Sequence, residues 1–206
     1  MKIAIKTFIA ILTTTIILGT TAATTFAEDG KKETMLSEVK KVNKINVSGN
    51  VELILVQSSD ERVKIYDEYY AKNALVQQEA GELRISSYNK ETLTVVVYVS
   101  NLTEISASAN ASIRTAGKFN ALSLVVNLKD QASANLNTNT VDLSSNVAGL
   151  AKLTLAGYSE SYNGLVAGNA NVNMEQFAAA SKSIQSKNSA IAASFALNKA
   201  QVLGAE

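Results

Sequence analysis

The chain has 206 residues with 19 basic and 18 acidic side chains, and it contains no cysteine, histidine, tryptophan or proline. Without histidine or cysteine it can form neither a Ser-His-Asp or Cys-His catalytic arrangement nor a zinc site with thiolate or imidazole ligands. Carboxylates, lysines, tyrosines and hydroxyls remain for catalysis, and they form no recognisable constellation along the sequence. We therefore expect no enzyme, no cofactor and no bound metal.

The first 27 residues have the pattern of a secretory signal peptide. Lys2 and Lys6 supply the positive start, an apolar and threonine-rich stretch runs over 7–19, and small residues lead to Ala27, after which we place cleavage. The unbroken apolar part is shorter than the roughly 20 residues that a membrane-spanning helix needs. We expect an exported protein in the periplasm, at the cell surface or outside the cell, with no membrane span after cleavage.

Removal of residues 1–27 leaves 179 residues, enough for one domain that buries on the order of 70% of the surface of its unfolded chain. Loss of Lys2 and Lys6 leaves 17 basic against 18 acidic side chains, a net charge near −1. This balance argues against a nucleic-acid partner. Residues 28–41 are rich in lysine and glutamate, which predicts a flexible leader in which 34–39 could form a short helix. The single domain is expected over 42–206.

From Val42 the apolar residues recur with period two, which predicts strands. The run 93–99 is so rich in β-branched residues that both of its faces should be covered. A short helix is expected over 67–76. The predicted strands lie at 45–47, 51–55, 62–66, 81–85 and 93–99, with polar turns at 48–50 and 58–61. This N-terminal region is the more charged one, with 22 charged side chains in 28–100 against 13 in 101–206.

After Leu102 the sequence repeats with a period near twenty residues. Aligned four-residue segments begin at Asn110, Gln131, Leu150, Asn169 and Asn188, at offsets of 21, 19, 19 and 19 residues. Each segment ends on an apolar residue, namely Ile113, Ala134, Leu153, Val172 and Ile191. This period predicts a right-handed parallel β-helix, or β-solenoid, with coils of about 20 residues that stack on one another, clearest over 102–201. The alternative is a chance match in a sequence rich in Ala, Ser and Asn.

The composition suits stacked coils. Asparagine tolerates the left-handed turn conformations that otherwise require glycine, so we expect asparagines at the turns. Asparagines one coil apart, such as Asn169 and Asn188, could stack with their amides hydrogen-bonded along the axis. Proline would remove a ladder hydrogen bond, and its absence agrees with a fold made of ladders.

Several segments resemble a known family, the bacterial exported domains named putative auto-transporter adhesin, head GIN domain. The resemblance lies in residues 45–57, which are similar to the opening pair of strands of that family, in 81–86, and in 102–113, which resemble its first repeat. It covers about residues 42–200. The resemblance implies a mainly parallel β-helix, export to the envelope or surface, and no defined catalytic positions.

Two tyrosine-rich segments are candidate contacts for a ligand or partner. The segment 158–164 is expected to be a polar turn between coils, where Tyr158, Glu160 and Tyr162 could meet a ligand, with a plain solvated turn as the alternative. Tyr69 and Tyr70 could form a second contact, or simply mark a strand end that enters a helix.

A carbohydrate-active enzyme, either a polysaccharide lyase or a hydrolase, is the alternative function, because such enzymes also use parallel β-helices. It needs a close pair of carboxylates or acidic metal ligands on one face. Only Asp142 and Glu160, 18 residues apart, approach a one-coil stack. We therefore expect a non-catalytic, adhesin-like module of the cell envelope or surface that binds a surface glycan or an envelope protein, with self-association through an uncapped end as a third option.

Overall fold

The computed structural model describes residues 33–36, 39, 41–66 and 74–187. The predicted signal peptide over 1–27, the candidate contacts Tyr69 and Tyr70, and the aligned segment that begins at Asn188 lie outside these residues.

The described residues form thirteen strands of one sheet and no helix, so the all-β prediction is confirmed. Two strands, β4 and β7, have the predicted bounds. The strands are β1 (Glu33–Leu36), β2 (Lys44–Gly49), β3 (Val51–Gln57), β4 (Arg62–Tyr66), β5 (Ala74–Glu79), β6 (Glu82–Ser87), β7 (Leu93–Val99), β8 (Glu104–Ser108), β9 (Ser112–Thr115), β10 (Phe119–Leu128), β11 (Ser133–Val147), β12 (Lys152–Ala167) and β13 (Asn171–Lys187).

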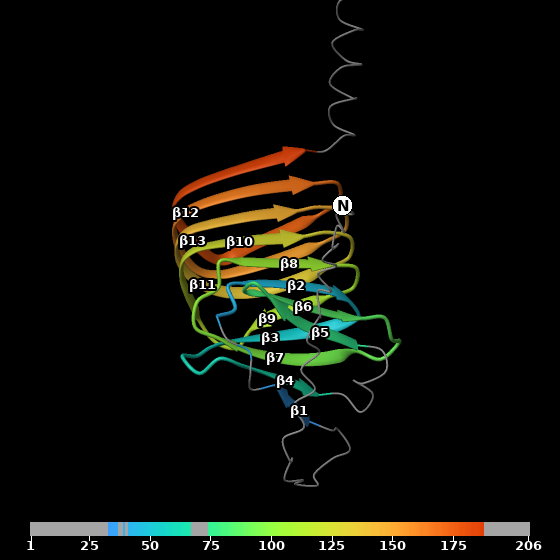
Figure 1. Cartoon of the computed structure of the whole chain (residues 1–206). Coiled ribbons are helices and arrows are strands. Elements are labelled where there is room, and N and C mark those ends of the chain that lie inside the picture. Colours follow the sequence, from blue (N-terminus) through green and yellow to red (C-terminus); the bar gives the residue numbers. More distant parts are fainter. Residues whose placement is uncertain (1–32, 37–38, 40, 67–73, 188–206) are drawn as a thin grey trace, which may run out of the picture.

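The C-terminal strands are long, bent and parallel, and they curl the sheet around a core (Figure 1). β9 and β8 pair with β11 and β10 at offsets of 21 residues, and β10, β11 and β12 then follow at 19. β13 pairs with β12 at an offset of 19 up to Thr154 and of 20 after a bulge. Ile113 pairs with Ala134, Ala134 with Leu153, and Leu153 with Val172. The register therefore joins the same apolar positions that align in the sequence.

The turns of successive rows also stack, and each contains one residue with left-handed backbone. The N–H of the following residue donates to the carbonyl of the left-handed residue in the row below, as from Leu150 to Asp130 (2.7 Å) and from Asn169 to Gly149 (2.9 Å). The left-handed residues are Ala109, Asp130, Gly149 and Gly168, with φ between 56° and 75°. Asn110 and Asn169 lie in these turns, as expected, but each stands one position after the left-handed residue and does not itself adopt that conformation.

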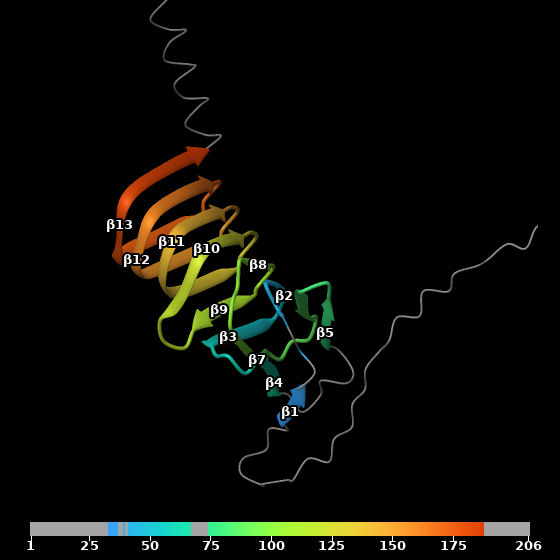
Figure 2. The same ribbon diagram turned by 60° about the vertical axis from the view of Figure 1, so that its left-hand side comes forward.

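The rows of the N-terminal half do not follow the order of the chain. β2 lies between β6 and β8, and β3 lies between β7 and β9. The row built from 44–57 therefore lies next to the C-terminal rows, and the row built from 82–99 lies beyond it, although it comes later in the chain. Antiparallel strands then extend this end of the sheet: β5 pairs with β6, β4 with β7, and β1 with β4. Figure 2 shows these strands at one end of the stack and β13 at the other.

Both helices expected from the sequence were wrong where the structure describes them. Within 34–39, Thr34–Leu36 belong to β1, and within 67–76, the final residues 74–76 belong to β5. The segment 28–41, predicted as a flexible leader, thus contains a strand, and its Val39 is 5% exposed. Open strand edges of β4 and β6 explain the difference, because pairing with an existing strand overrides weak local preference.

The core lies inside the curl, filled by the inward residues of each strand. Ile, Leu and Val dominate it from β2 to β11, and Tyr162 and Phe119 are its largest fully buried side chains. Some inward hydroxyls pair between neighbouring strands, as where Thr140 Oγ1 donates to Ser159 Oγ at 2.9 Å, whereas the buried Thr138 hydroxyl has no hydrogen-bond partner among the described residues. In β13 the corresponding apolar residues Val172, Met174 and Phe177 are only partly buried.

Candidate functional site

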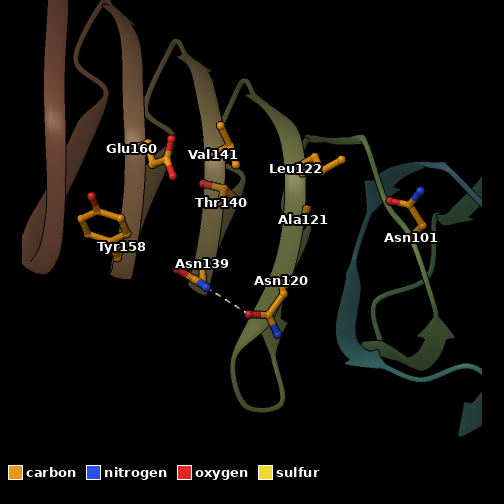
Figure 3. A pocket seen from close by; sticks show the side chains of 9 residues that line it. All are labelled: Asn101, Asn120, Ala121, Leu122, Asn139, Thr140, Val141, Tyr158 and Glu160. Atoms are coloured by element: carbon orange, nitrogen blue, oxygen red, sulfur yellow. Dashed lines mark hydrogen bonds between the residues drawn. The ribbon is translucent and has the colours of Figure 1, made fainter.

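A shallow groove of about 410 Å³ crosses the outer surface where β10, β11 and β12 bend (Figure 3). We call it the corner groove. It begins at the loop before β8 and ends at β12, so it crosses the strands instead of following one. Its lining residues are Asn101, Asn120, Ala121, Leu122, Asn139, Thr140, Val141, Tyr158 and Glu160.

The bend places side chains outward in an unusual pattern. Along β11 the inward residues are Thr138 and Thr140, then Leu143, so the two consecutive residues Val141 and Asp142 both face solvent. In β12 the alternation of inward and outward residues shifts in the same way after Ser159: Glu160 and Ser161 both lie between the inward Ser159 and Tyr162. Such a corner exposes one more residue per strand than regular alternation allows.

One wall of the groove is a row of amides that ends on a phenol. Asn120 pairs with Asn139, and Asn139 pairs with Tyr158, in the parallel register. Asn139 Nδ2 donates to Asn120 Oδ1 at 3.3 Å. Gln57 anchors this row: its Nε2 donates to the Asn120 carbonyl at 2.8 Å, and its Oε1 accepts from the Asn120 N–H at 2.9 Å. The row is therefore held in place from β3 to β11.

The other wall is a row of corner residues from the same strands. Ala121 pairs with Thr140 and Ser123 with Asp142, which sets Leu122 beside Val141, and the same register on β12 sets Val141 beside Glu160. Leu122 is 79% exposed and Val141 is 38% exposed. With Tyr158, at 41%, these are three of the seven large hydrophobic side chains exposed among the described residues. Their gathering in one hollow distinguishes it from the scattered exposed apolar residues that are normal on a protein surface.

Several hydrogen-bonding groups of the groove remain available to a ligand. Among the described residues the Tyr158 hydroxyl, the Glu160 carboxylate and the Asn139 Oδ1 take part in no hydrogen bond or ion pair, whereas the Asn120 amide is used on both sides. The floor is rigid, because Thr140 is buried and bonded to the buried Ser159. The groove thus combines a fixed base with free donors and acceptors at its rim.

Of the residues predicted as contacts, the structure brings Tyr158 and Glu160 together in the groove (Figure 3). Tyr162 was wrong: it is 1% exposed, its hydroxyl is 2.8 Å from Ser145 Oγ, and its ring meets Phe177 edge-on at 5.5 Å. Burial raises the pKa of the Tyr162 phenol, against a smaller lowering by the Ser145 hydrogen bond. The predicted turn over 158–164 is part of β12, and the corner after Ser159 turns Tyr162 inward.

Asn120, Asn139, Leu122 and Val141 were not predicted as site residues. A signal for them existed, because Asn120, Asn139 and Tyr158 are spaced by 19 residues, as are Leu122, Val141 and Glu160. That spacing equals the strand register. The sequence does not show, however, at which position of the period the strand bends and exposes two neighbours.

The acidic pair considered for an enzyme, Asp142 and Glu160, does not stack in register. Asp142 pairs with Ser161, so Glu160 is one position out of register with it. Glu160 is the only carboxylate among the lining residues of the groove. In the part of the chain that the structure describes, no three acidic side chains gather as a metal site would require, and no helix is long and apolar enough to cross a bilayer.

Comparison with known protein families finds one match over most of the chain. The profile of the family described as "Putative auto-transporter adhesin, head GIN domain" matches residues 41–203. No curated protein matches the chain.

Solved structures share the fold at low identity. A putative adhesin from Bacteroides fragilis NCTC 9343 is 15% identical with a TM-score of 0.68, over 78% of each chain. A putative adhesin from Parabacteroides distasonis ATCC 8503 is 15% identical with a TM-score of 0.61, over 77% of this chain and 79% of that one. A putative lipid binding protein from the same strain is 13% identical with a TM-score of 0.57, over 78% and 79%. At these identities the likeness supports the fold alone.

Proposed function

The chain belongs to the family described as putative auto-transporter adhesin, head GIN domain, and from that premise we propose that it is a non-catalytic, exported module that binds a partner at the cell envelope or surface. The family supports a surface or exported location. The compartment, whether periplasm, cell surface or medium, is part of the proposal, as is removal of residues 1–27 on export.

We also propose that the curled stack is a right-handed β-solenoid. Parallel pairing at offsets of 19 to 21 residues, and turns that stack through their own backbone hydrogen bonds, support it. In a solenoid each coil repeats the outward positions of the last. Side chains one coil apart then form rows, and a binding surface extends over several coils without any change of backbone.

The corner groove is the main structural support for a binding function. It holds the exposed aromatic ring of Tyr158, the exposed apolar side chains of Leu122 and Val141, and unpaired hydrogen-bonding groups on a rigid floor. Exposed apolar groups rimmed by polar ones are typical of interaction sites. A lone carboxylate, Glu160, supports binding over hydrolysis, since glycoside hydrolysis ordinarily uses two.

Binding of the purified full chain to intact bacterial cells and to isolated envelopes tests the function. We expect saturable binding that falls about tenfold in Tyr158→Ala and stays unchanged in Tyr88→Ala, a matched control that is 85% exposed and lies outside the groove. Release of reducing ends from envelope polysaccharides should be absent. Turnover that is lost in Glu160→Gln would replace the binding module with the carbohydrate-active enzyme.

A further inference from the structure

We propose that the corner groove binds a neutral glycan chain laid across β10, β11 and β12, with the apolar face of a sugar ring on Tyr158 and Val141 and its hydroxyls on Asn139 and Glu160. This inference rests on the proposed function and specifies its ligand. The shape, the charge and the side-chain chemistry of the groove each favour such a ligand.

The shape favours an elongated ligand. The groove crosses three parallel strands, which lie about 4.8 Å apart in a sheet. Its volume of about 410 Å³ falls at the lower end of the roughly 300–1,000 Å³ of small-molecule sites. Figure 3 shows the lining side chains in successive rows from Asn101 to Glu160, so a chain molecule can lie along the groove in the stacking direction.

The charge favours a neutral ligand. Glu160 is the one charged residue of the lining, and no lysine or arginine is among the lining residues. A phosphate, an acidic polysaccharide or an anionic lipid headgroup would meet a carboxylate without a compensating cation, which costs binding energy. Hydroxyl groups, in contrast, donate readily to a carboxylate in a charge-assisted hydrogen bond.

The side-chain chemistry matches both sides of a sugar ring. A pyranose has a face of C–H groups and a rim of hydroxyls. Tyr158 and Val141 offer partly exposed apolar surface on neighbouring strands, and a tyrosine ring supplies rigid contact area at small entropic cost. Asn139 Oδ1 and the Glu160 carboxylate are free to accept from the hydroxyl rim, while Gln57 and Asn120 hold the Asn139 amide in orientation.

Calorimetric titration of the full chain with soluble oligosaccharides tests the inference. The neutral probes are glucan, mannan and xylan oligosaccharides, and the anionic probes are oligogalacturonate and phosphatidylglycerol vesicles. We expect binding of at least one neutral probe and of neither anionic probe, with little dependence on salt. Affinity should fall about tenfold in Tyr158→Ala and in Asn139→Ala, and stay within about twofold in Tyr88→Ala.

Leu122→Glu is a second groove variant that avoids a folding artefact, because the side chain is 79% exposed. It replaces exposed apolar surface of the groove by a charged, hydrated group, so it should weaken the apolar contact with the neutral probe while the circular dichroism of the protein stays unchanged. Neutral-glycan binding that no groove variant affects would overturn the assignment of the site.

The outcomes separate this inference from the proposed function. Binding to cells and envelopes together with binding only to the anionic oligosaccharide or the vesicles would overturn the neutral ligand and leave the interaction module standing. Absence of binding to cells, envelopes and every probe would overturn both.

Discussion

Gly157 shows how closely neighbouring strands approach at the bend. Its φ is 98°, and a Cβ added there would lie 2.1 Å from the Thr138 carbonyl oxygen. Gly157→Ala should therefore destabilise the protein by roughly 1–3 kcal/mol from overpacking, in addition to roughly 1–2 kcal/mol for an L-residue at positive φ. Urea unfolding followed by circular dichroism measures the total.

Gly117→Ala is the control for this prediction. Gly117 also has positive φ, at 91°, but no heavy atom lies within 4 Å of its added Cβ. It should lose only the conformational part, so equal losses in the two variants would contradict the close approach as the cause.

Glu61 connects the start of the domain to the loop before β8. Its carboxylate accepts from the Ser100 Oγ (2.5 Å), the Ser100 N–H (3.3 Å) and the Val42 N–H (3.3 Å). Partial burial by itself would raise the pKa of Glu61, but the hydrogen bonds from Ser100, and then from the backbone of Lys41 and Val42, outweigh it and hold the pKa below its ordinary 4.5.

A lowered pKa makes the contribution of Glu61 dependent on pH. Because the unfolded chain binds the proton more tightly, the stabilisation is complete above the unfolded pKa and is lost as the pH falls through the folded one. Glu61→Gln should therefore be less stable than the natural chain at neutral pH, and the gap should narrow on acidification. Urea unfolding midpoints of the two proteins, measured at several pH values, give this difference in stability. Glu160→Gln, with no hydrogen bond among the described residues, should show no such gap.

At the scale of a strand, the corner of β12 decides which tyrosine faces solvent and which one packs in the core. Tyr162 lies inside the curl, 2.8 Å from Ser145 Oγ on β11. Tyr162→Phe should cost about 1–3 kcal/mol, because it leaves the buried Ser145 hydroxyl without that partner. The double variant with Ser145→Ala removes both polar groups and should recover part of the loss, as a double-mutant cycle in urea measures.

Tyr158→Phe is the control for these variants, because it removes a tyrosine hydroxyl that has no hydrogen-bond partner among the described residues. Its effect should stay within about 0.5 kcal/mol. Strict additivity of the Tyr162 and Ser145 losses would show that the hydrogen bond does not couple the two strands.

Over the whole molecule, the two ends of the stack differ. β1, β4 and β5 add antiparallel strands at one end, whereas β13 pairs only with β12 among the described residues and its apolar residues are partly exposed. Hydrogen exchange should therefore be slowest in the central strands β9 to β11 and clearly faster in β13, whose outward amides have no partner in a described strand. Equal protection of β11 and β13 would indicate that another segment or a second copy covers this edge.

Much of the fold could be predicted because a strand imposes period two and a stacked row imposes a longer period. The bounds of β4 and β7, and the register that joins Ile113, Ala134 and Leu153, follow from such patterns. The strands β1 and β5 could not be predicted in this way. Their residues have no strong preference of their own, and a neighbouring edge determines their structure.

Two residues that line the corner groove, Tyr158 and Glu160, were candidates from the sequence for a related reason. Both were expected to face a ligand. The sequence alone also determined that no histidine or cysteine chemistry is available and that the net charge is close to zero. It likewise contains the 19-residue spacing of Asn120, Asn139 and Tyr158. Only the tertiary structure decided that the row of 82–99 stacks outside that of 44–57, and that Tyr162 is in the core. Both depend on how the chain bends in space: local patterns record which residues alternate, but the position of a corner and the order of stacked rows depend on contacts between distant segments.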